Sequence, residues 1–182
     1  MKLNKVFWLA AVMVLAVTLF GCKKKKNESE GGKAQKEEVV RSNVEKATMA
    51  FAQTDDDLGA YDSIKFVGYK SYYKSEYCDF MCQLLSIQRN ELQPQFDSAV
   101  NNRDNDALIQ VSKKIDTIQC CIDYFNKQAY NSLTTRQDPV VIYETRCYSY
   151  TDGYVEEYVY FVTKDWKVIE LNPYDLHFLD GF

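Results

Sequence analysis

The sequence contains one histidine in 182 residues and lacks several short motifs that carry catalysis. No Gly-x-Ser-x-Gly run is present, so no nucleophile elbow is indicated. Neither a glycine-rich phosphate loop nor a Cys-x-x-Cys pair occurs. Acidic residues outnumber basic ones by 26 to 22, whereas a nucleic-acid surface needs a basic face. We therefore expect no catalytic residue, no cofactor, no metal and no nucleic-acid partner.

The one histidine leaves a single catalytic alternative open. A Cys-His dyad could form between Cys147 and His177, although nothing in the local sequence around either residue supports it. Glu156 and Glu157 are neighbours in an expected strand, so their carboxylates point to opposite faces and do not form a matched acid and base. Catalysis is therefore the least favoured of the functions considered.

The amino-terminal segment carries a targeting pattern. Lys2 and Lys5 precede an apolar stretch, Val6 to Phe20, in which Thr18 is the only polar residue, and four lysines follow at 23–26. A charged head, an apolar run of about 15 residues and a small residue before the cut are typical of a signal peptide. The run is shorter than the roughly 20 residues of a transmembrane helix, which makes a retained signal anchor the alternative.

The end of this run, Leu19-Phe20-Gly21-Cys22, resembles the lipobox of bacterial lipoproteins, with Leu19, Gly21 and Cys22 at matching positions. The resemblance implies that residues 1–21 are a signal peptide and that Cys22 carries several acyl chains, palmitate among them. More than one chain is needed for stable attachment to a membrane. In that family an aspartate after the cysteine can retain the protein in the inner membrane. Lys23 occupies that position here, which implies the outer membrane of a bacterial cell envelope.

Composition divides the rest of the chain in two. Residues 22–36 are rich in charge, contain Gly31-Gly32 and have almost no apolar side chains, so we expect a flexible tether after the lipidated cysteine. Residues 37–182 have the length of one ordinary domain with its own core.

Hydrophobic periodicity predicts helices and strands in this domain. The expected helices are Ala34–Gln53, Tyr77–Val100 and a third that covers 108–129; the expected strands are Ser63–Tyr73, Val140–Tyr150, Tyr154–Thr163 and Trp166–Leu171. Asp152-Gly153 is a tight hairpin turn between two of the strands. Gly68 suggests a bulge in the first strand. The tail, 172–182, contains several apolar residues and is expected to pack on the domain.

The longest regular feature is a pair of helices. In the second helix, apolar residues recur three and four positions apart, which makes a seam for a close antiparallel partner. These residues are Leu108, Val111, Ile115, Ile118, Ile122, Phe125 and Ala129. Residues 101–106 are the expected turn, with Asp104 or Asn105 as the N-cap of the second helix. Pro94 is expected to kink or restart the first helix.

This element order predicts an α+β domain: a helix, one strand, a long helical hairpin and a three-stranded antiparallel meander, with helices on one face of the sheet. The order is similar to the cystatin-like and NTF2-like folds. The runs Asp62–Phe66, Tyr160–Val162 and Lys167–Ile169 also resemble small uncharacterised lipoproteins of Bacteroides-type bacteria.

Five cysteines follow Cys22, and an oxidising envelope permits disulfides. We expect a disulfide that staples the helical pair, between Cys82 and Cys120 or Cys121, with Cys78 able to take the other. An odd cysteine must stay free or pair between chains, and Cys147 is the candidate. Zinc is the alternative for the same four, but structural zinc sites favour pairs separated by two residues.

The sequence is rich in tyrosine, with 14 in all. Tyrosine offers rigid, amphipathic area for contacts with protein or sugar, and it is also an ordinary strand residue that half-buries well. The candidate binding surface lies on the expected sheet and comprises Tyr143, Tyr148, Tyr150, Tyr154, Tyr158 and Tyr160.

Together these patterns predict a non-catalytic, lipid-anchored binding or interaction protein of the bacterial cell envelope. Its partners would be the membrane, through Cys22, and an envelope protein or glycan. The alternative is an inhibitor or immunity-type lipoprotein directed against one enzyme or toxin, and a periplasmic enzyme is the third possibility.

Overall fold

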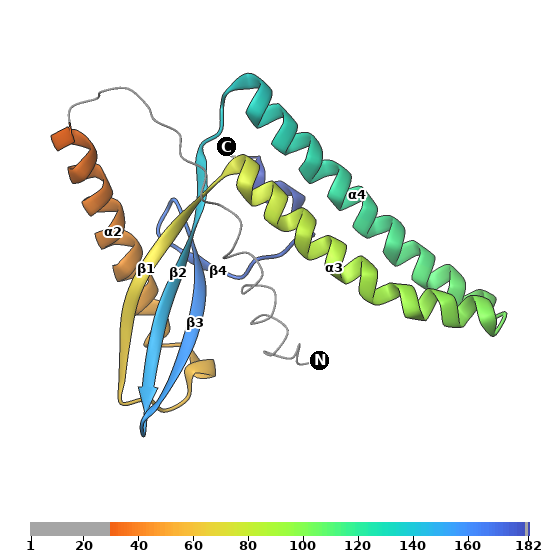
Figure 1. The fold of residues 1–182 in the computed structure, drawn as a ribbon, viewed down its shortest axis with the longest axis horizontal. Coiled ribbons are helices and arrows are strands. Elements are labelled where there is room, and N and C mark those ends of the chain that lie inside the picture. The colour runs from red at the N-terminus through yellow and green to blue at the C-terminus, as the bar shows by residue number, and fades with distance from the viewer. Residues whose placement is uncertain (1–29, 181) are drawn as a thin grey trace. The chain divides into compact units, whose positions relative to one another are not determined.

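The computed structural model describes residues 30–180 and 182, and it divides the chain into two compact units, 1–36 and 37–182. All the strands described here lie in the second unit (Figure 1). In chain order the elements are α2 Glu30–Ala52, η1 Asp56–Leu58, β1 Ser63–Tyr73, α3 Lys74–Asn101, α4 Asn105–Thr135, β2 Val140–Thr151, β3 Tyr154–Thr163, β4 Val168–Ile169 and η2 Leu176–Leu179.

The four strands form one antiparallel sheet in the order β1-β2-β3-β4. Asp152 and Gly153 turn β2 into β3 with φ of 46° and 84°, the positive values that a two-residue hairpin turn requires. The register of β1 against β2 shifts between Phe66 and Gly68, where the sequence suggested a bulge. The predicted α+β class, element order and antiparallel meander are confirmed.

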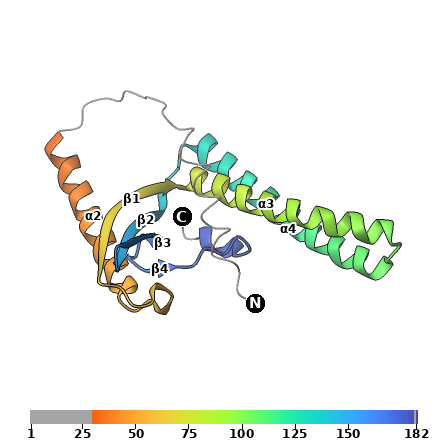
Figure 2. The same cartoon turned by 60° about the horizontal axis from the view of Figure 1, so that its bottom comes forward.

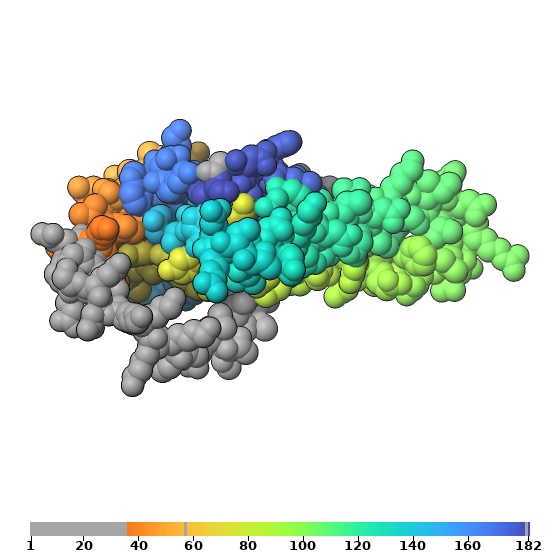
Figure 3. All heavy atoms as spheres, turned by 90° about the horizontal axis from the view of Figure 1, so that it is seen from above, coloured from red at the N-terminus to blue at the C-terminus, as the bar shows by residue number. Residues whose placement is uncertain are grey.

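The predicted helical hairpin is also confirmed. Its helices, α3 and α4, have 28 and 31 residues and lie side by side (Figures 2 and 3). Asp104 caps α4, because its side chain accepts a hydrogen bond of 3.0 Å from the backbone N–H of Ala107. The α3 helix continues through Pro94, so the proline does not restart it. The Pro94 side chain is exposed.

The base of the hairpin is tied to the sheet by Asp138, which lies between α4 and β2. One carboxylate oxygen accepts a hydrogen bond of 2.8 Å from the N–H of Ser75, and the other accepts one of 2.6 Å from the Ser75 hydroxyl. Ser75 lies in the first turn of α3, where a negative charge is favourable because the N–H groups there lack partners inside the helix. Asp138 thus fixes where α3 leaves the sheet.

The helices contact both faces of the sheet (Figure 2), whereas we expected them on one. On the first face, the Thr48 hydroxyl of α2 donates a hydrogen bond of 3.2 Å to the Thr145 hydroxyl of β2. On the second, the Phe80 ring of α3 lies 5.7 Å from the Tyr72 ring and 6.2 Å from the Phe161 ring. Phe161 pairs with Glu144, so these two side chains share a face. Thr145 follows Glu144 and points to the opposite face, because successive strand residues alternate.

Both ends of the domain differ in detail from the expectations. The α2 helix begins at Glu30 rather than Ala34, so residues 30–36 are helical where a flexible tether was expected. No described helix is long and apolar enough to cross a membrane. The last strand, β4, contains only Val168 and Ile169.

The tail packs as predicted. The Phe178 ring lies 5.1 Å from the Tyr77 ring of α3, and Leu179 is buried. The Tyr124 hydroxyl of α4 donates a hydrogen bond of 2.7 Å to the backbone oxygen of Leu176.

Candidate functional site

No helix in the described part of the chain lies over one half of the second sheet face, and this half forms the best candidate site. We call it the Tyr148 face and define it by Lys65, Arg146, Tyr148, Tyr150, Val155 and Glu157, whose register places them on one side of three neighbouring strands. Val155 is 57% exposed, and Lys65 and Glu157 are also exposed. The two tyrosines are half-buried. The result is a mixed surface with an apolar and aromatic centre and charged borders.

A buried carboxylate holds this face together. Glu144 is 5% exposed, and it accepts hydrogen bonds from the Tyr72 hydroxyl at 2.9 Å and from Arg146 Nε and Nη2 at 3.2 and 3.0 Å. Arg146 Nη1 also lies 3.5 Å from Glu157 Oε1. Burial and the neighbouring Glu144 raise the pKa of Tyr72, so its hydroxyl remains a donor. The network orients the Arg146 guanidinium, and the register places Arg146 on the same face as Tyr148.

The six candidate tyrosines do not form one surface. Tyr143 and Tyr160 are buried in the core that α2 covers. The prediction that they belong to an exposed binding surface is therefore wrong. The register puts Tyr154 and Tyr158 on that same α2 face, and Tyr154 is 77% exposed. Tyr148 and Tyr150 lie on the opposite face. The division follows from the alternation of side chains along a strand.

The expected disulfide staple is absent: the structure describes Cys78, Cys82, Cys120, Cys121 and Cys147 as free thiols. The Cys82 thiol lies 3.6 Å from the Ile122 backbone oxygen and 3.6 Å from Asn126 Oδ1, both acceptors on α4. Cys121 instead lies near Tyr174 of the tail, where burial and then that thiol raise the pKa of the tyrosine. Cys82 and Cys121 therefore have different neighbours, although their helices are in contact.

These environments predict a graded thiol reactivity. Cys120 is exposed, whereas burial raises the pKa of Cys147 to about 11 and that of Cys78 to about 12. Because the thiolate is the reactive form, a chromogenic disulfide reagent at pH 8 should modify Cys120 first and leave Cys78 and Cys147 unmodified until the protein unfolds. The fast phase should vanish in Cys120→Ser. Unfolding without reductant should expose five reactive thiols besides Cys22. A lower count would indicate that a disulfide is present in the protein.

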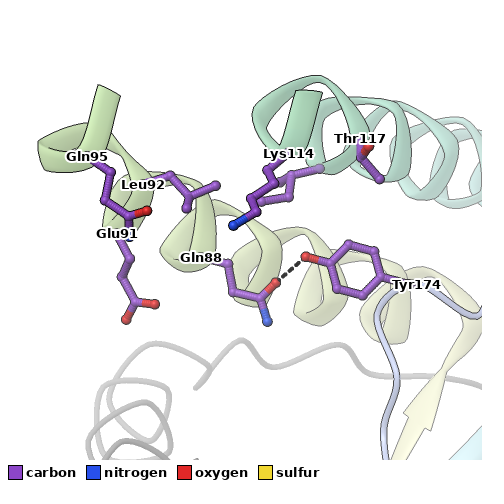
Figure 4. A pocket seen from close by; sticks show the side chains of 8 residues that line it. Gln88, Glu91, Leu92, Gln95, Lys114, Thr117 and Tyr174 are labelled. Atoms are coloured by element: carbon purple, nitrogen blue, oxygen red, sulfur yellow. Dashed lines mark hydrogen bonds between the residues drawn. The ribbon is translucent and has the colours of Figure 1, made fainter. Parts of the chain in front are cut away.

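A shallow hollow of about 390 Å³ lies on one side of the hairpin. Figure 4 shows Lys114 reaching from α4 toward α3, while the Tyr174 hydroxyl from the tail meets Gln88 Oε1 at 2.7 Å. Its lining consists of Gln88, Glu91, Leu92, Gln95, Lys114, Thr117, Ile118 and Tyr174. Burial raises the pKa of Tyr174, so its hydroxyl stays neutral where it meets Gln88.

The structure does not bring the catalytic alternative together. Cys147 is buried in the core between α2 and the sheet, while the His177 side chain is 91% exposed in the tail and its Nδ1 lies 2.9 Å from Asp180 Oδ2. This carboxylate raises the pKa of His177. In the described part of the chain, no three His, Cys, Asp or Glu side chains are arranged to hold a metal ion, which leaves the zinc alternative without a ligand set there.

Cys22 and the expected signal peptide lie outside the residues that the structure describes. No family model matches the chain, and neither a curated protein nor a solved structure matches it.

The binding surface predicted from the sequence consists of tyrosines alone, so it does not include Lys65, Arg146, Val155 or Glu157. A signal was present in the sequence. Glu144, Arg146 and Tyr148 alternate within an expected strand, and alternate strand residues share a face. The positions opposite them on β1 and β3 depend on the pairing register, which the sequence does not show.

Proposed function

We propose that this chain is a lipid-anchored, non-catalytic binding protein of the bacterial cell envelope. Cys22 attaches it to the membrane, by resemblance to the lipobox, and the Tyr148 face contacts a partner in the envelope. The observation that carries the binding role is the exposed half of a sheet face on which Tyr148, Tyr150 and Val155 lie together.

The chemistry of this face suits recognition. Tyrosine side chains lose little conformational entropy on binding, since they have few rotatable bonds and combine an apolar ring with a polar hydroxyl. Arg146 is already oriented by Glu144, so less freedom is lost when it meets a partner. Its side chain is 42% exposed and therefore accessible. A preorganised arginine on the same face as two tyrosines is the kind of group found in binding surfaces.

The hollow on the hairpin supports the catalytic alternative less well. An enzyme site normally combines a concave pocket with titratable groups whose pKa values are shifted toward their task. The titratable residues in the lining are Glu91, Lys114 and Tyr174, and burial is the main cause that raises the pKa of Tyr174. A raised tyrosine pKa stabilises the neutral hydroxyl and does not make it a base near pH 7.

One experiment in cells tests both halves of the proposal. A photoreactive amino acid placed at Tyr148 of the full chain should cross-link to one discrete envelope component, and the chain should fractionate with membranes. Placed at Asn90, an exposed residue of α3, the same group should yield no such product. Cys22→Ser should release the chain from membranes, because the acyl chains supply the attachment.

Two outcomes would contradict the proposal. Membrane retention of Cys22→Ser would remove the lipid anchor. Equal cross-linking from positions 148 and 90, or a product that persists when Tyr150 and Val155 are both replaced by serine, would remove the Tyr148 face as the binding surface. A single enzyme or toxin as the captured partner would support the inhibitor alternative.

A further inference from the structure

The sheet has one free edge along β1 and another along the part of β3 that the short β4 does not pair with. The two edges differ in how they are protected against pairing with a further strand. β1 carries Lys65 and Lys70 and a register shift between Phe66 and Gly68, and charged lysines and bulges both discourage the pairing of an edge with another strand. β3 has no basic residue, no proline and no register shift against β2. β4 pairs with only Phe161 and Val162 of this strand.

The backbone of β3 therefore presents unpaired groups along its first half. The N–H of Thr163 donates a hydrogen bond of 2.9 Å to the backbone oxygen of Lys167, on the side away from β2. Because direction alternates along a strand, the N–H and C=O groups of Val155, Glu157 and Val159 point the same way. No described residue pairs with these groups. They form a short template for one more strand.

The side chains beside this template are acidic. Glu157 lies on the Tyr148 face, where its Oε1 is 3.5 Å from Arg146 Nη1, and Glu156 lies on the opposite face. Both glutamates are exposed. Glu156 accepts a hydrogen bond of 2.7 Å from the Tyr158 hydroxyl, so its carboxylate is held along β3. A strand added here would place its own side chains next to a carboxylate on either face, and opposite charges at such cross-strand positions are stabilising.

We propose that the free edge of β3 binds an extended, basic peptide segment of a partner protein as an additional β-strand. Main-chain hydrogen bonds to Val155, Glu157 and Val159 supply the attachment, and Glu156 and Glu157 select lysine or arginine, as in known strand-addition complexes. The inference rests on the proposed binding function and names its partner class. It also continues that surface, since Val155 and Glu157 belong to the Tyr148 face.

A second copy of the chain fits this edge less well. In an antiparallel pair of two β3 strands, residues whose backbone N–H and C=O groups point away from β2 must lie opposite one another to form the hydrogen bonds. A pair centred on Glu157 places that residue opposite itself, and a pair centred on Glu156 does the same for Glu156. Like charges directly opposite each other are destabilising, so two of the available registers are disfavoured.

The test uses the full chain in detergent with a labelled probe peptide, Val-Lys-Lys-Val-Lys-Lys-Val, which presents lysines on both faces of a strand. Fluorescence anisotropy should show binding that is lost for the matching glutamate peptide. It should also be lost when two adjacent central amides of the basic peptide are N-methylated, which keeps the charge but blocks main-chain pairing. On binding, hydrogen exchange should slow at least about tenfold at the amides of Val155, Glu157 and Val159.

A matched pair of variants tests the edge itself. Val155→Pro removes an outward N–H without removing a bond to β2, which edge strands tolerate, and should weaken peptide binding at least about tenfold. Val155→Thr changes the same side chain but keeps the N–H, so it should bind the peptide at least about tenfold more tightly than Val155→Pro.

Equal binding of the N-methylated peptide, equal binding by Val155→Pro and Val155→Thr, or protection at β1 in place of β3 would overturn the inference. Dimerisation through the same amides without peptide would assign the edge to a second copy. The cross-linking at Tyr148 is a separate measurement from these. The inference about the β3 edge can therefore fail while the proposed function is supported.

Discussion

Replacing Phe125 by alanine should lower the free energy of unfolding by about 3–5 kcal/mol. Phe125 has 0% exposure, and its ring lies 6.2 Å from that of Tyr77 and 5.4 Å from that of Tyr124. Tyr77 in turn contacts Phe178 of the tail. The truncation would remove buried apolar area and leave a cavity where both hairpin helices and the tail meet, and neighbouring side chains collapse only partly into such a space.

Urea denaturation followed by circular dichroism measures this effect. The matched control is Tyr130→Ala, which removes an aromatic ring from the same helix at a position that is 68% exposed; we expect a change within about 0.5 kcal/mol. Equal losses for Phe125→Ala and Tyr130→Ala would contradict the packing at the base of the hairpin.

Replacing Glu144 by alanine should cost on the order of 3 kcal/mol in the free energy of unfolding. The substitution removes the acceptor of the Tyr72 hydroxyl, and the Tyr72 side chain is buried. An unsatisfied buried donor costs about 1–3 kcal/mol, and hydrogen bonds to a charged group contribute about 1.5–3 kcal/mol. Arg146 also loses two of its hydrogen bonds but keeps Glu157 and contact with solvent, which limits the penalty on its side.

Glu156→Ala is the control, because this glutamate lies on the same sheet but is exposed; it should change stability by about 0.5 kcal/mol or less. A double-mutant cycle of Glu144→Ala with Tyr72→Phe should show a coupling energy of about 0.5–3 kcal/mol. Additive effects of the two substitutions would mean that the hydrogen bond between them does not stabilise the protein.

Much of the fold could be predicted from local patterns. The spacing of Val111, Ile118 and Phe125 marks one helix face, and all three side chains are buried against the partner helix in the structure. The β2–β3 turn followed from Asp152-Gly153 because few other residues adopt positive φ readily. These features depend on neighbours a few positions apart in the chain.

The thiols illustrate a relation that local patterns leave open. Periodicity shows which face of a helix meets its partner, but it leaves open how far one helix is shifted along the other. That shift places Cys82 beside Ile122 and Asn126, and the expected staple to Cys120 or Cys121 does not form. Shape complementarity along the whole interface sets the shift.

The sequence by itself determined the α+β class, the helical hairpin, the antiparallel meander and the alternation of side chains along each strand, because each follows from short-range periodicity and turn chemistry. Only the tertiary structure decided that α2 takes the face of Tyr143 and Tyr160, that Tyr148 and Tyr150 remain on the other, and that Glu144 is buried between Tyr72 and Arg146. Those outcomes depend on contacts between residues far apart in the chain. They are settled by which arrangement buries the most apolar surface while leaving no buried polar group without a partner.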